Sequence, residues 1–251
     1  MFVVNALDRL DRPLQVPLDH PYPGRPHRVY VALTNACNVA CPWCCTFSGP
    51  HKRTFISRGK FVKNLPLRGN FEVQLEGGEP TLHPDWRWMA DAAHATKRCT
   101  KVVLCTNGTT LPRGKRGLAR FFSTLPVPFL LKLSVNHYLL ELFPDHLDLA
   151  ARVVDALDAL GPGFGVVLNV RLRYNAATRD DEHLLKALME RDLLERANIF
   201  HLQRLGRAAN DPDPRVKPPQ LVGFNFREVG PDGKNYGTDI VARSNAMNEL
   251  E

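Results

Sequence analysis

The chain has 251 residues, of which 44% are hydrophobic and 24% are charged. These proportions are those of a globular chain that can bury a core, in one sizeable domain or two small ones. No apolar run is long enough to span a bilayer, and residues 1–5 lack the basic and apolar regions of a signal peptide. We therefore expect a cytoplasmic protein, in which thiols stay reduced.

The formal net charge is +7 and the pI is near 9.2. A solvated, arginine-rich surface is the simplest explanation. An anionic partner, such as a nucleotide, a phosphorylated metabolite or RNA, is the alternative. No nucleic-acid-binding motif stands out, so the charge alone does not decide between the two.

Prolines at positions 13, 17, 21, 23 and 26 predict that residues 1–27 form an extended leader. After the leader, strand and helix patterns alternate, which implies a parallel sheet with right-handed crossovers. Six units are too few for a closed eight-stranded barrel, so we expect residues 28–205 to form an α/β fold, an open, partial (βα)6 barrel. The predicted strands are 28–34, 71–76, 101–106, 129–135, 165–173 and 199–205, and the best helical patterns are 85–97, 114–124, 144–160 and 180–196.

Residues 206–251 form a different, C-terminal part. Paired prolines and Asp-Pro steps between 211 and 219 predict a loop. Residues 224–229 and 236–241 have strand character, and the turn chemistry of 231–233 between them predicts a β-hairpin. This hairpin would cover an open edge of the sheet or close one side of a substrate cavity.

The predicted strands alternate in polarity. In the fifth strand, Asn169, Arg171 and Arg173 share one face and apolar residues share the other, because side chains alternate with period two. A purely structural barrel would fill its interior with Val, Ile and Leu. We expect the polar set to line the bore, where it is costly to bury without ligands; a sheet with one solvated face is the alternative. Other members are Glu72, Gln74, Glu76, Lys132, Ser134, Asn136, His201 and Gln203.

Three cysteines, Cys37, Cys41 and Cys44, have the spacing C-x3-C-x2-C. Three thiolates in one short loop suit an iron–sulfur cluster, and a closed cubane takes four cysteines, so one iron would be left open for a ligand that is not protein. A structural zinc site is the alternative, with Cys45 or His51 as the fourth ligand.

The sequence Gly77-Gly78-Glu79-Pro80 ends the second predicted strand. The cysteine motif followed by this motif resembles the radical S-adenosylmethionine (radical SAM) enzymes. In that family the open iron binds S-adenosylmethionine (SAM), and an aromatic residue usually precedes the third cysteine, as Trp43 does here. The resemblance therefore implies a 4Fe–4S cluster held by Cys37, Cys41 and Cys44, and it disfavours both zinc and Cys45 as the third ligand.

The resemblance also implies contacts to SAM. Glu79 and the backbone of its motif would hold the methionine amino group, and the glycines allow a close backbone approach. Arg171 or Arg173 would suit the carboxylate, since a guanidinium binds it with two parallel hydrogen bonds. Ser134 matches a family residue that contacts ribose or carboxylate, and Trp43 would lie near the adenine. The remaining cofactor-binding candidates are Gly77, Gly78, Pro80, Asn107, Asn136, Asn169 and Gln203.

The reaction that the family shares begins with one electron from the reduced cluster. The electron cleaves SAM and leaves a 5'-deoxyadenosyl radical, which abstracts hydrogen from the substrate, while the protein supplies orientation and excludes water. Cys105 could donate a hydrogen atom to a product radical, although a free cysteine there is more often a small buried hydrophobe, as we expect for Cys99. His137, Tyr138 and Asn175 are candidates for substrate contact.

Three functions follow from these patterns. The first is a radical SAM enzyme acting on a polar small molecule or a peptide, supplied with electrons by a flavodoxin or a ferredoxin. The second is an activase that abstracts hydrogen from a glycine of a partner enzyme, although residues 131–136 lack the Asp-x-Lys pattern that we associate with activases. The third is a zinc-binding interaction module without catalysis. No membrane partner is expected.

Overall fold

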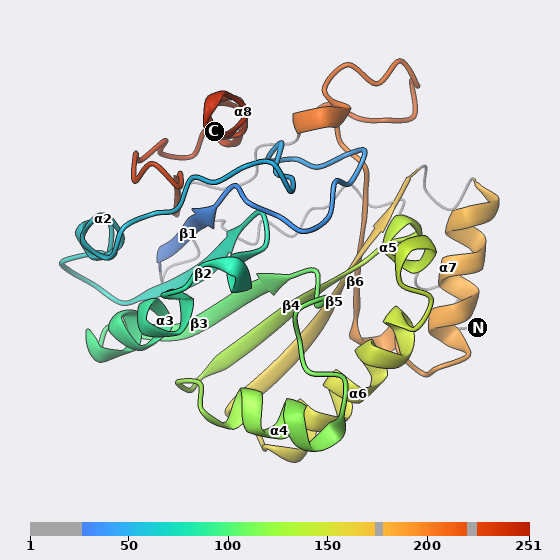
Figure 1. Ribbon diagram of the computed structural model, residues 1–251, viewed down its shortest axis with the longest axis horizontal. Helices are drawn as coiled ribbons and strands as arrows, with labels where there is room; N and C mark the ends of the chain where they lie inside the picture. The colour runs from blue at the N-terminus through green and yellow to red at the C-terminus, as the bar shows by residue number, and fades with distance from the viewer. Residues whose placement is uncertain (1–26, 174–177, 220–224) are drawn as a thin grey trace.

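The computed structural model describes residues 27–173, 178–219 and 225–251 (Figure 1). The predicted leader lies outside these ranges except for His27, and Asn175 also lies outside them. Seven strands form one parallel sheet in the order β6-β5-β4-β3-β2-β1-β7, with β6 and β7 at its two edges. The open α/β sheet predicted from the sequence is confirmed. The strands are β1 (His27–Thr34), β2 (Phe71–Gly77), β3 (Cys99–Thr106), β4 (Phe129–Val135), β5 (Phe164–Leu172), β6 (Ala197–His201) and β7 (Phe226–Val229).

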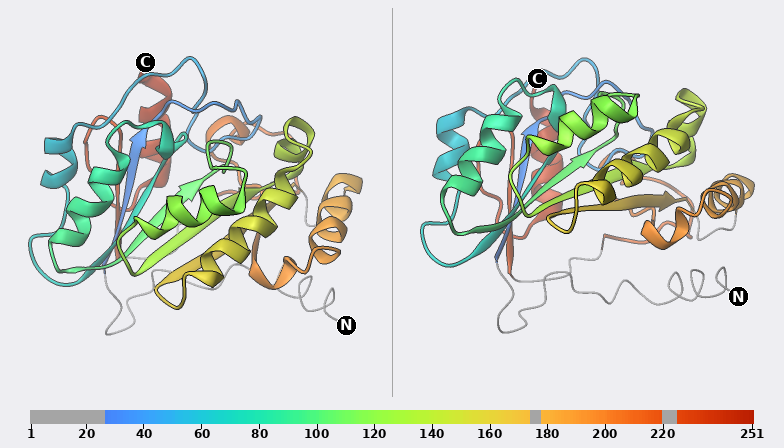
Figure 2. Two further views of the ribbon diagram at one scale, coloured as in Figure 1. Left: turned by 60° about the horizontal axis from the view of Figure 1, so that its bottom comes forward. Right: turned by 90° about the horizontal axis from the view of Figure 1, so that it is seen from below.

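Helices cover mainly one face of this sheet. The helices between consecutive strands from β2 to β6 lie together on that face, as Figure 2 shows. The helices are α2 (Arg58–Lys63), α3 (Trp86–Ala95), α4 (Lys115–Ser123), α5 (His137–Leu142), α6 (His146–Ala159), α7 (Arg179–Met189) and α8 (Ile240–Glu249), with short 3-10 turns η1 (Pro80–Leu82), η2 (Leu194–Arg196) and η3 (Gly206–Ala208).

The alternation of polar and apolar residues along the strands gives the sheet one polar and one apolar face. The apolar residues Val73, Leu131 and Val170 are fully buried and belong to one large core, which the helices complete. Their polar neighbours, such as Gln74 and Asn169, are half-buried. The polar face is therefore the face that these helices leave uncovered, as the sequence pattern predicted.

Short polar side chains fix where several helices begin. Ser57, Asn136 and Thr178 accept hydrogen bonds from the first-turn backbone N–H groups of α2, α5 and α7. Such caps satisfy donors that have no partner within the helix. The acidic residues 180–182 in the first turn of α7 also complement the helix dipole.

The predicted C-terminal hairpin is wrong in its second strand. Gly237 takes a positive φ of 60° and turns the chain, and the Asp239 side chain accepts a hydrogen bond from Ala242 N at 2.8 Å, so α8 begins where the strand was expected. One antiparallel bridge, Val229 to Asn235, remains of the hairpin. The first predicted strand does form, but as β7 it pairs in parallel with β1 and extends the sheet.

The sixth strand and the helix before it end earlier than the sequence predicted. The sixth strand ends at His201, four residues before the predicted end, and α7 ends at Met189, seven residues early. Helices α2 and α5 were not predicted; each has six residues, which is too short for a clear helical period.

Helix α8 adds a charged group to the polar face of the sheet. Arg243 is 4% exposed, and its guanidinium lies 2.6 Å from a Glu76 carboxylate oxygen and 2.5 Å from one of Glu228. Burial raises the pKa of Glu228 to about 7. Burial opposes the charge of Arg243, but the two carboxylates outweigh it and raise the pKa of Arg243. Because a buried charge without a partner is costly, this ion triad holds α8 against β2 and β7.

None of the helices in the described ranges has the length and apolar character needed to cross a membrane.

We expect Leu131→Ala to lower the free energy of unfolding by about 2–5 kcal/mol, because Leu131 is fully buried at the centre of the sheet. Leu67→Ala is the matched control, since Leu67 is 87% exposed and its truncation should change stability by less than about 0.5 kcal/mol. Urea unfolding followed by circular dichroism measures both. Equal effects would contradict the placement of the core.

Candidate functional site

The sequence motifs meet at one edge of the sheet. The cysteine loop, residues 35–50, follows β1. The Gly-Gly-Glu-Pro motif begins at Gly77, the last residue of β2, and Asn107 follows β3. Because β1, β2 and β3 are neighbouring parallel strands, their C-terminal ends lie side by side. In barrels of βα units, the active site lies at this edge.

The two glycines fasten the cysteine loop to the end of β2. Gly78 N donates to Thr34 O at 2.7 Å, and Glu79 N donates to Ala36 O at 2.8 Å. A Cβ on Gly78 would lie 2.1 Å from Ala36 O, and one on Gly77, whose φ is 131°, would lie 2.3 Å from Thr34 O. Only glycine permits so close an approach of two backbones. The spacing between the motifs is therefore set by direct backbone contact.

The Glu79 side chain fastens the end of β3 to the same place. It is fully buried, and its carboxylate accepts hydrogen bonds from Thr106 Oγ1 at 2.7 Å and from Asn107 N at 2.8 Å. It also accepts from Thr81 N at 3.2 Å, so Glu79 caps η1. Burial raises the pKa of Glu79. In this structure the carboxylate is held by the protein and aligns the ends of β2 and β3.

The three thiols lie on the loop that these contacts position. Asn107 Nδ2 donates to Cys37 Sγ at 3.7 Å, and the Thr46 hydroxyl lies 3.4 Å from Cys44 Sγ. Burial raises the pKa of Cys37 and of Cys41 to about 12. Since the thiolate is the form that binds metal, a bound cation would offset this effect of burial. Within the described ranges, no three His, Cys, Asp or Glu residues are gathered as for a single metal ion.

A residue far along the chain holds the other side of the cysteine loop. Arg207 donates from Nη1 to Cys41 O at 2.8 Å, from Nη2 to Ser48 O at 2.8 Å, and from its backbone N to Cys44 O at 2.9 Å. Gly206, with φ of 62°, lies so close that a Cβ would be 2.2 Å from Cys44 O. Sequence reasoning missed both residues. A Gly-Arg pair after the sixth strand is their only signal, and it is not specific.

Trp43 packs within the protein. Its ring lies 4.8 Å from that of His137 and 6.0 Å from that of Tyr138, and it is 8% exposed. It forms a small apolar cluster with Leu202, Ala208 and Val216. The packing joins the cysteine loop to α5 and to the segment after β6, and the predicted contact with adenine stays a prediction.

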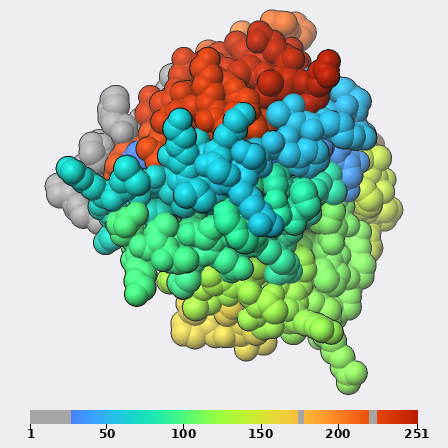
Figure 3. Space-filling model, turned by 60° about the vertical axis from the view of Figure 1, so that its left-hand side comes forward, coloured from blue at the N-terminus to red at the C-terminus, as the bar shows by residue number. Residues whose placement is uncertain are grey.

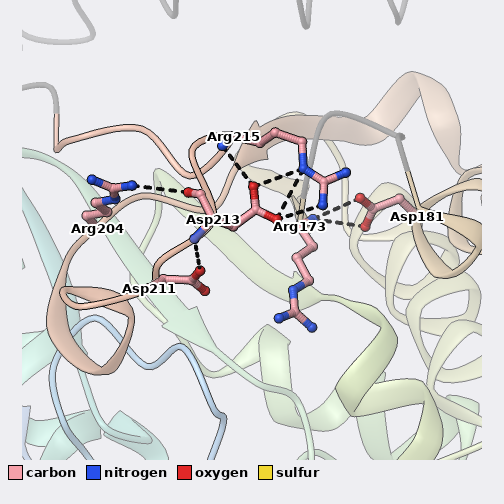
Figure 4. A network of polar contacts seen from close by, with 6 residues as sticks. All are labelled: Arg173, Asp181, Arg204, Asp211, Asp213 and Arg215. Atoms are coloured by element: carbon pink, nitrogen blue, oxygen red, sulfur yellow. Dashed lines mark hydrogen bonds and ion pairs between the residues drawn. The ribbon is translucent and has the colours of Figure 1, made fainter.

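Arg171 of β5 and Arg173, which follows this strand, have different surroundings. Arg171 lies with its guanidinium 4.7 Å from the Phe200 ring, and its charge lowers the pKa of Cys41 and Cys45 against the larger effect of burial. Arg173 lies beside an acidic network, which Figure 4 shows: its backbone N donates to both carboxylate oxygens of Asp181 at 2.9 and 3.0 Å. Arg171 is therefore the arginine beside the cysteine loop.

The same network orders the segment after β6. The hydrogen bond from the Arg215 guanidinium lowers the pKa of Asp213 to about 2, and Arg204 Nη2 donates to Asp213 O at 3.2 Å (Figure 4). Arg204 N also donates to Lys217 O at 2.8 Å. These contacts close residues 204–217 into a compact loop beside Arg173.

Comparisons with known proteins agree with this arrangement. No family model matches the chain. A stretch of 88 residues, 34% of the chain, is 32% identical to the GTP 3',8-cyclase of Chlorobaculum tepidum and covers 27% of that protein. A stretch of 118 residues, 45% of the chain, is 30% identical to the GTP 3',8-cyclase of Synechocystis sp. and covers 36% of it. The chain thus matches only about a third of the length of these relatives.

Solved structures share the fold at low identity. The structure of anSMEcpe with bound AdoMet and Cp18Cys peptide has a TM-score of 0.51 and 16% identity, over 71% of this chain and 52% of that one. SuiB of Streptococcus suis, bound to S-adenosylmethionine, also has a TM-score of 0.51, with 15% identity, over 78% of this chain and 44% of that one. The cysteine loop and the Gly-Gly-Glu-Pro turn lie together on this fold. These similarities support the resemblance of the chain to the radical SAM enzymes.

The resemblance to the radical SAM enzymes implies SAM and a 4Fe–4S cluster as cofactors. The donor set fits: three thiols stand on one loop, their charges act on one another, and the Asn107 amide already contacts one sulfur. A cubane binds each of its cysteines through a different iron, so its ligands stand further apart than those of one ion.

The remaining predicted residues have defined places. Ser134 and Asn169 lie half-buried on the polar face, and Asn169 Oδ1 accepts from Asn198 Nδ2 at 3.3 Å. Asn136 is 6% exposed and caps α5, while Gln203 pairs with Lys217. Cys105 is half-buried, and burial raises its pKa to about 12.

We expect Gly78→Ala to lower the iron and sulfide bound after anaerobic reconstitution, because the added Cβ would push Ala36 and the cysteine loop away. Such overpacking costs about 1–3 kcal/mol. Gly59→Ala is the control, because a Cβ on Gly59 meets no atom within 4 Å. Iron and sulfide assays measure both proteins. Normal iron content in Gly78→Ala would contradict the role of this contact.

Proposed function

We propose that this chain is a radical SAM enzyme that cleaves SAM reductively and uses the resulting 5'-deoxyadenosyl radical to abstract hydrogen from a polar small molecule or a peptide. One observation carries the proposal. The three-cysteine loop is fastened by backbone hydrogen bonds to the Gly-Gly-Glu-Pro turn, at the C-terminal edge of an open parallel sheet and beside its polar face.

In this proposal Cys37, Cys41 and Cys44 hold the cluster, which supplies the one-electron reduction of SAM when it is bound. The protein's contribution is to fix the position of the cysteine loop. Arg207 holds the carbonyl groups of Cys41 and Cys44, and the Gly78 N–H holds the start of the loop through Thr34. Positioning of this kind accounts for much of what a protein adds to a cofactor's chemistry.

Of the two arginines, we assign Arg171 to the methionine carboxylate of SAM. Arg171 lies beside the cysteine loop, and in the described ranges no carboxylate lies within ion-pair distance of its guanidinium. The Phe200 ring beneath it restricts the orientation of the planar guanidinium and leaves its edge free to form two parallel hydrogen bonds.

The polar side chains on the uncovered face of the sheet favour a polar substrate over an apolar one. Lys132 Nζ donates to Gln74 Oε1 at 2.6 Å, and within the described ranges it too has no carboxylate at ion-pair distance. Its ammonium lies on the same face as Cys105, whose pKa it lowers against burial. An anionic group of the substrate would offset this charge. GTP, the substrate named for the curated relatives, and short peptides therefore belong in the first set of compounds to test.

The electron is expected to come from an external donor, such as a flavodoxin or a ferredoxin. Dithionite can replace that donor in a test, so the chemistry can be examined before either substrate or partner is known.

We expect the protein, purified without oxygen and reconstituted with iron and sulfide, to form 5'-deoxyadenosine from SAM and dithionite. Cys37→Ala, Cys41→Ala and Cys44→Ala should each reduce this product to background, because each removes a ligand of the cluster. Liquid chromatography with mass detection measures the product.

Two cysteine variants serve as controls. Cys99→Ala should retain the product, and Cys45→Ala tests whether Cys44 is the third ligand, since product from Cys45→Ala together with none from Cys44→Ala supports that assignment. Zinc in place of iron, with no 5'-deoxyadenosine from the parent, would overturn the proposal.

A further inference from the structure

One segment of the chain combines several positive charges with no acidic residue. Residues 51–70 contain six Lys and Arg residues and no Asp or Glu, while the whole chain has a net charge of only +7. Arg53, Arg58, Lys60, Lys63 and Arg68 are all exposed. These five exposed cations lie close together in the chain, between β1 and β2.

Large apolar side chains are exposed on the same segment. Leu67 is 87% exposed, Val62 47% and Phe55 38%, and Trp88 of α3 is 37% exposed beside them. The Arg58 guanidinium lies 4.7 Å from the Trp88 ring, which joins α2 to α3 on this surface. We name the exposed residues of 53–68, together with Trp88, the α2 surface. Adjoining exposed apolar and cationic groups of this kind mark an interaction site more often than a solvated face.

The α2 surface is continuous with the cysteine loop. Phe55 forms an antiparallel bridge with Thr34, Thr54 N donates to Asn35 Oδ1 at 2.9 Å, and Lys52 N donates to Gly49 O at 3.2 Å. Figure 3 shows the segment as a cyan band across one face of the molecule, below the C-terminal region in red. A protein covering this band would lie against the loop that carries the three cysteines.

Most cations of the α2 surface have no acidic neighbour. Arg58 pairs with Asp85, but within the described ranges no carboxylate lies within ion-pair distance of Lys60, Lys63 or Arg68. The basic helix α4 is paired in part: Lys115 lies 4.0 Å from Asp155 and, just before that helix, Arg113 lies 3.6 Å from Asp145. Within the described ranges Arg116 and Arg120 of α4 have no carboxylate at ion-pair distance, so they match the cations of the α2 surface as controls. The unpaired charge on the α2 surface would attract an acidic partner over a long range and speed its association.

We propose that the α2 surface docks the acidic electron-transfer protein that reduces the cluster, a proposal that rests on the function proposed above. One electron passes from the partner's reduced cofactor to the cluster, so the first is oxidised by one electron, the second is reduced by one, and no bond forms or breaks. The exposed Leu67, Val62 and Phe55 favour a protein partner over a nucleic acid, whose interfaces are more polar and more uniformly basic.

The test compares two double variants with the same change of net charge. Lys63→Glu with Arg68→Glu alters the α2 surface, and Arg116→Glu with Arg120→Glu alters exposed residues of α4. Binding of the cluster-loaded proteins to immobilised flavodoxin is measured by biolayer interferometry at low and high salt. We expect the α2 variant to weaken binding by about tenfold or more, the α4 variant to bind like the parent, and salt to weaken the parent. Leu67→Ser should weaken binding without changing the melting temperature.

A second measurement separates docking from chemistry. With NADPH, flavodoxin reductase and flavodoxin as the electron source, the α2 variant should form 5'-deoxyadenosine more slowly than the parent, while with dithionite the two should be equal. Equal binding and equal flavodoxin-driven rates for both double variants would overturn the docking proposal. So would tighter binding of the parent to a single-stranded RNA oligonucleotide, lost in the α2 variant. A parent that binds flavodoxin through the α2 surface but forms no 5'-deoxyadenosine with dithionite would instead count against the proposed function alone.

Discussion

The close contact between two stretches of backbone, at Gly77-Gly78 and at residues 34–36, is the constraint on which the rest of the site depends. Two hydrogen bonds below 2.9 Å join the turn after β2 to the loop after β1, and no side chain beyond hydrogen fits between them. The buried Glu79 carboxylate then extends the joint to β3. The C-terminal ends of β1, β2 and β3 are thus held together as one rigid unit, and this unit fixes the position of the cysteine loop.

The polar face of the sheet is divided electrostatically. On its β7–β1–β2 side the ionic groups are neutralised within the protein, by the triad of Arg243 with Glu76 and Glu228. On the β4–β5 side, Lys132 and Arg171 have no carboxylate at ion-pair distance within the described ranges. The ion pairs of the triad offset the free-energy cost of burying its charges, and they attach α8 to the sheet. For Lys132 and Arg171, a bound anionic ligand would offset that cost. A bound anion would therefore be drawn to one half of the sheet only.

Local patterns in the sequence were enough to predict the sheet and the cysteine loop, because both depend on short-range regularities. Period-two polarity gave the strands and their faces, and the order of the motifs placed them at one edge. Contacts between distant segments could not be predicted. Arg207 reaches Cys41 across 166 positions. The residues 236–241 alternate like a strand, yet the Asp239 cap and the buried ion triad stabilise a helix that begins there.

The hydrogen bonds around the cysteine loop also bear on redox potential. The carbonyl groups of Cys41, Cys44 and Cys45 are engaged by Arg207 and Ser244, so they do not point unpaired toward the sulfurs. A donor approaches one sulfur instead: the Asn107 amide donates to Cys37 Sγ, while the Thr46 hydroxyl lies beside Cys44 Sγ. Hydrogen bonds to cysteine sulfurs stabilise the more negative, reduced form of an iron–sulfur cluster and raise its potential. The Asn107 amide, just after β3, would thus make a cluster held on this loop easier to reduce, without supplying any of its ligands.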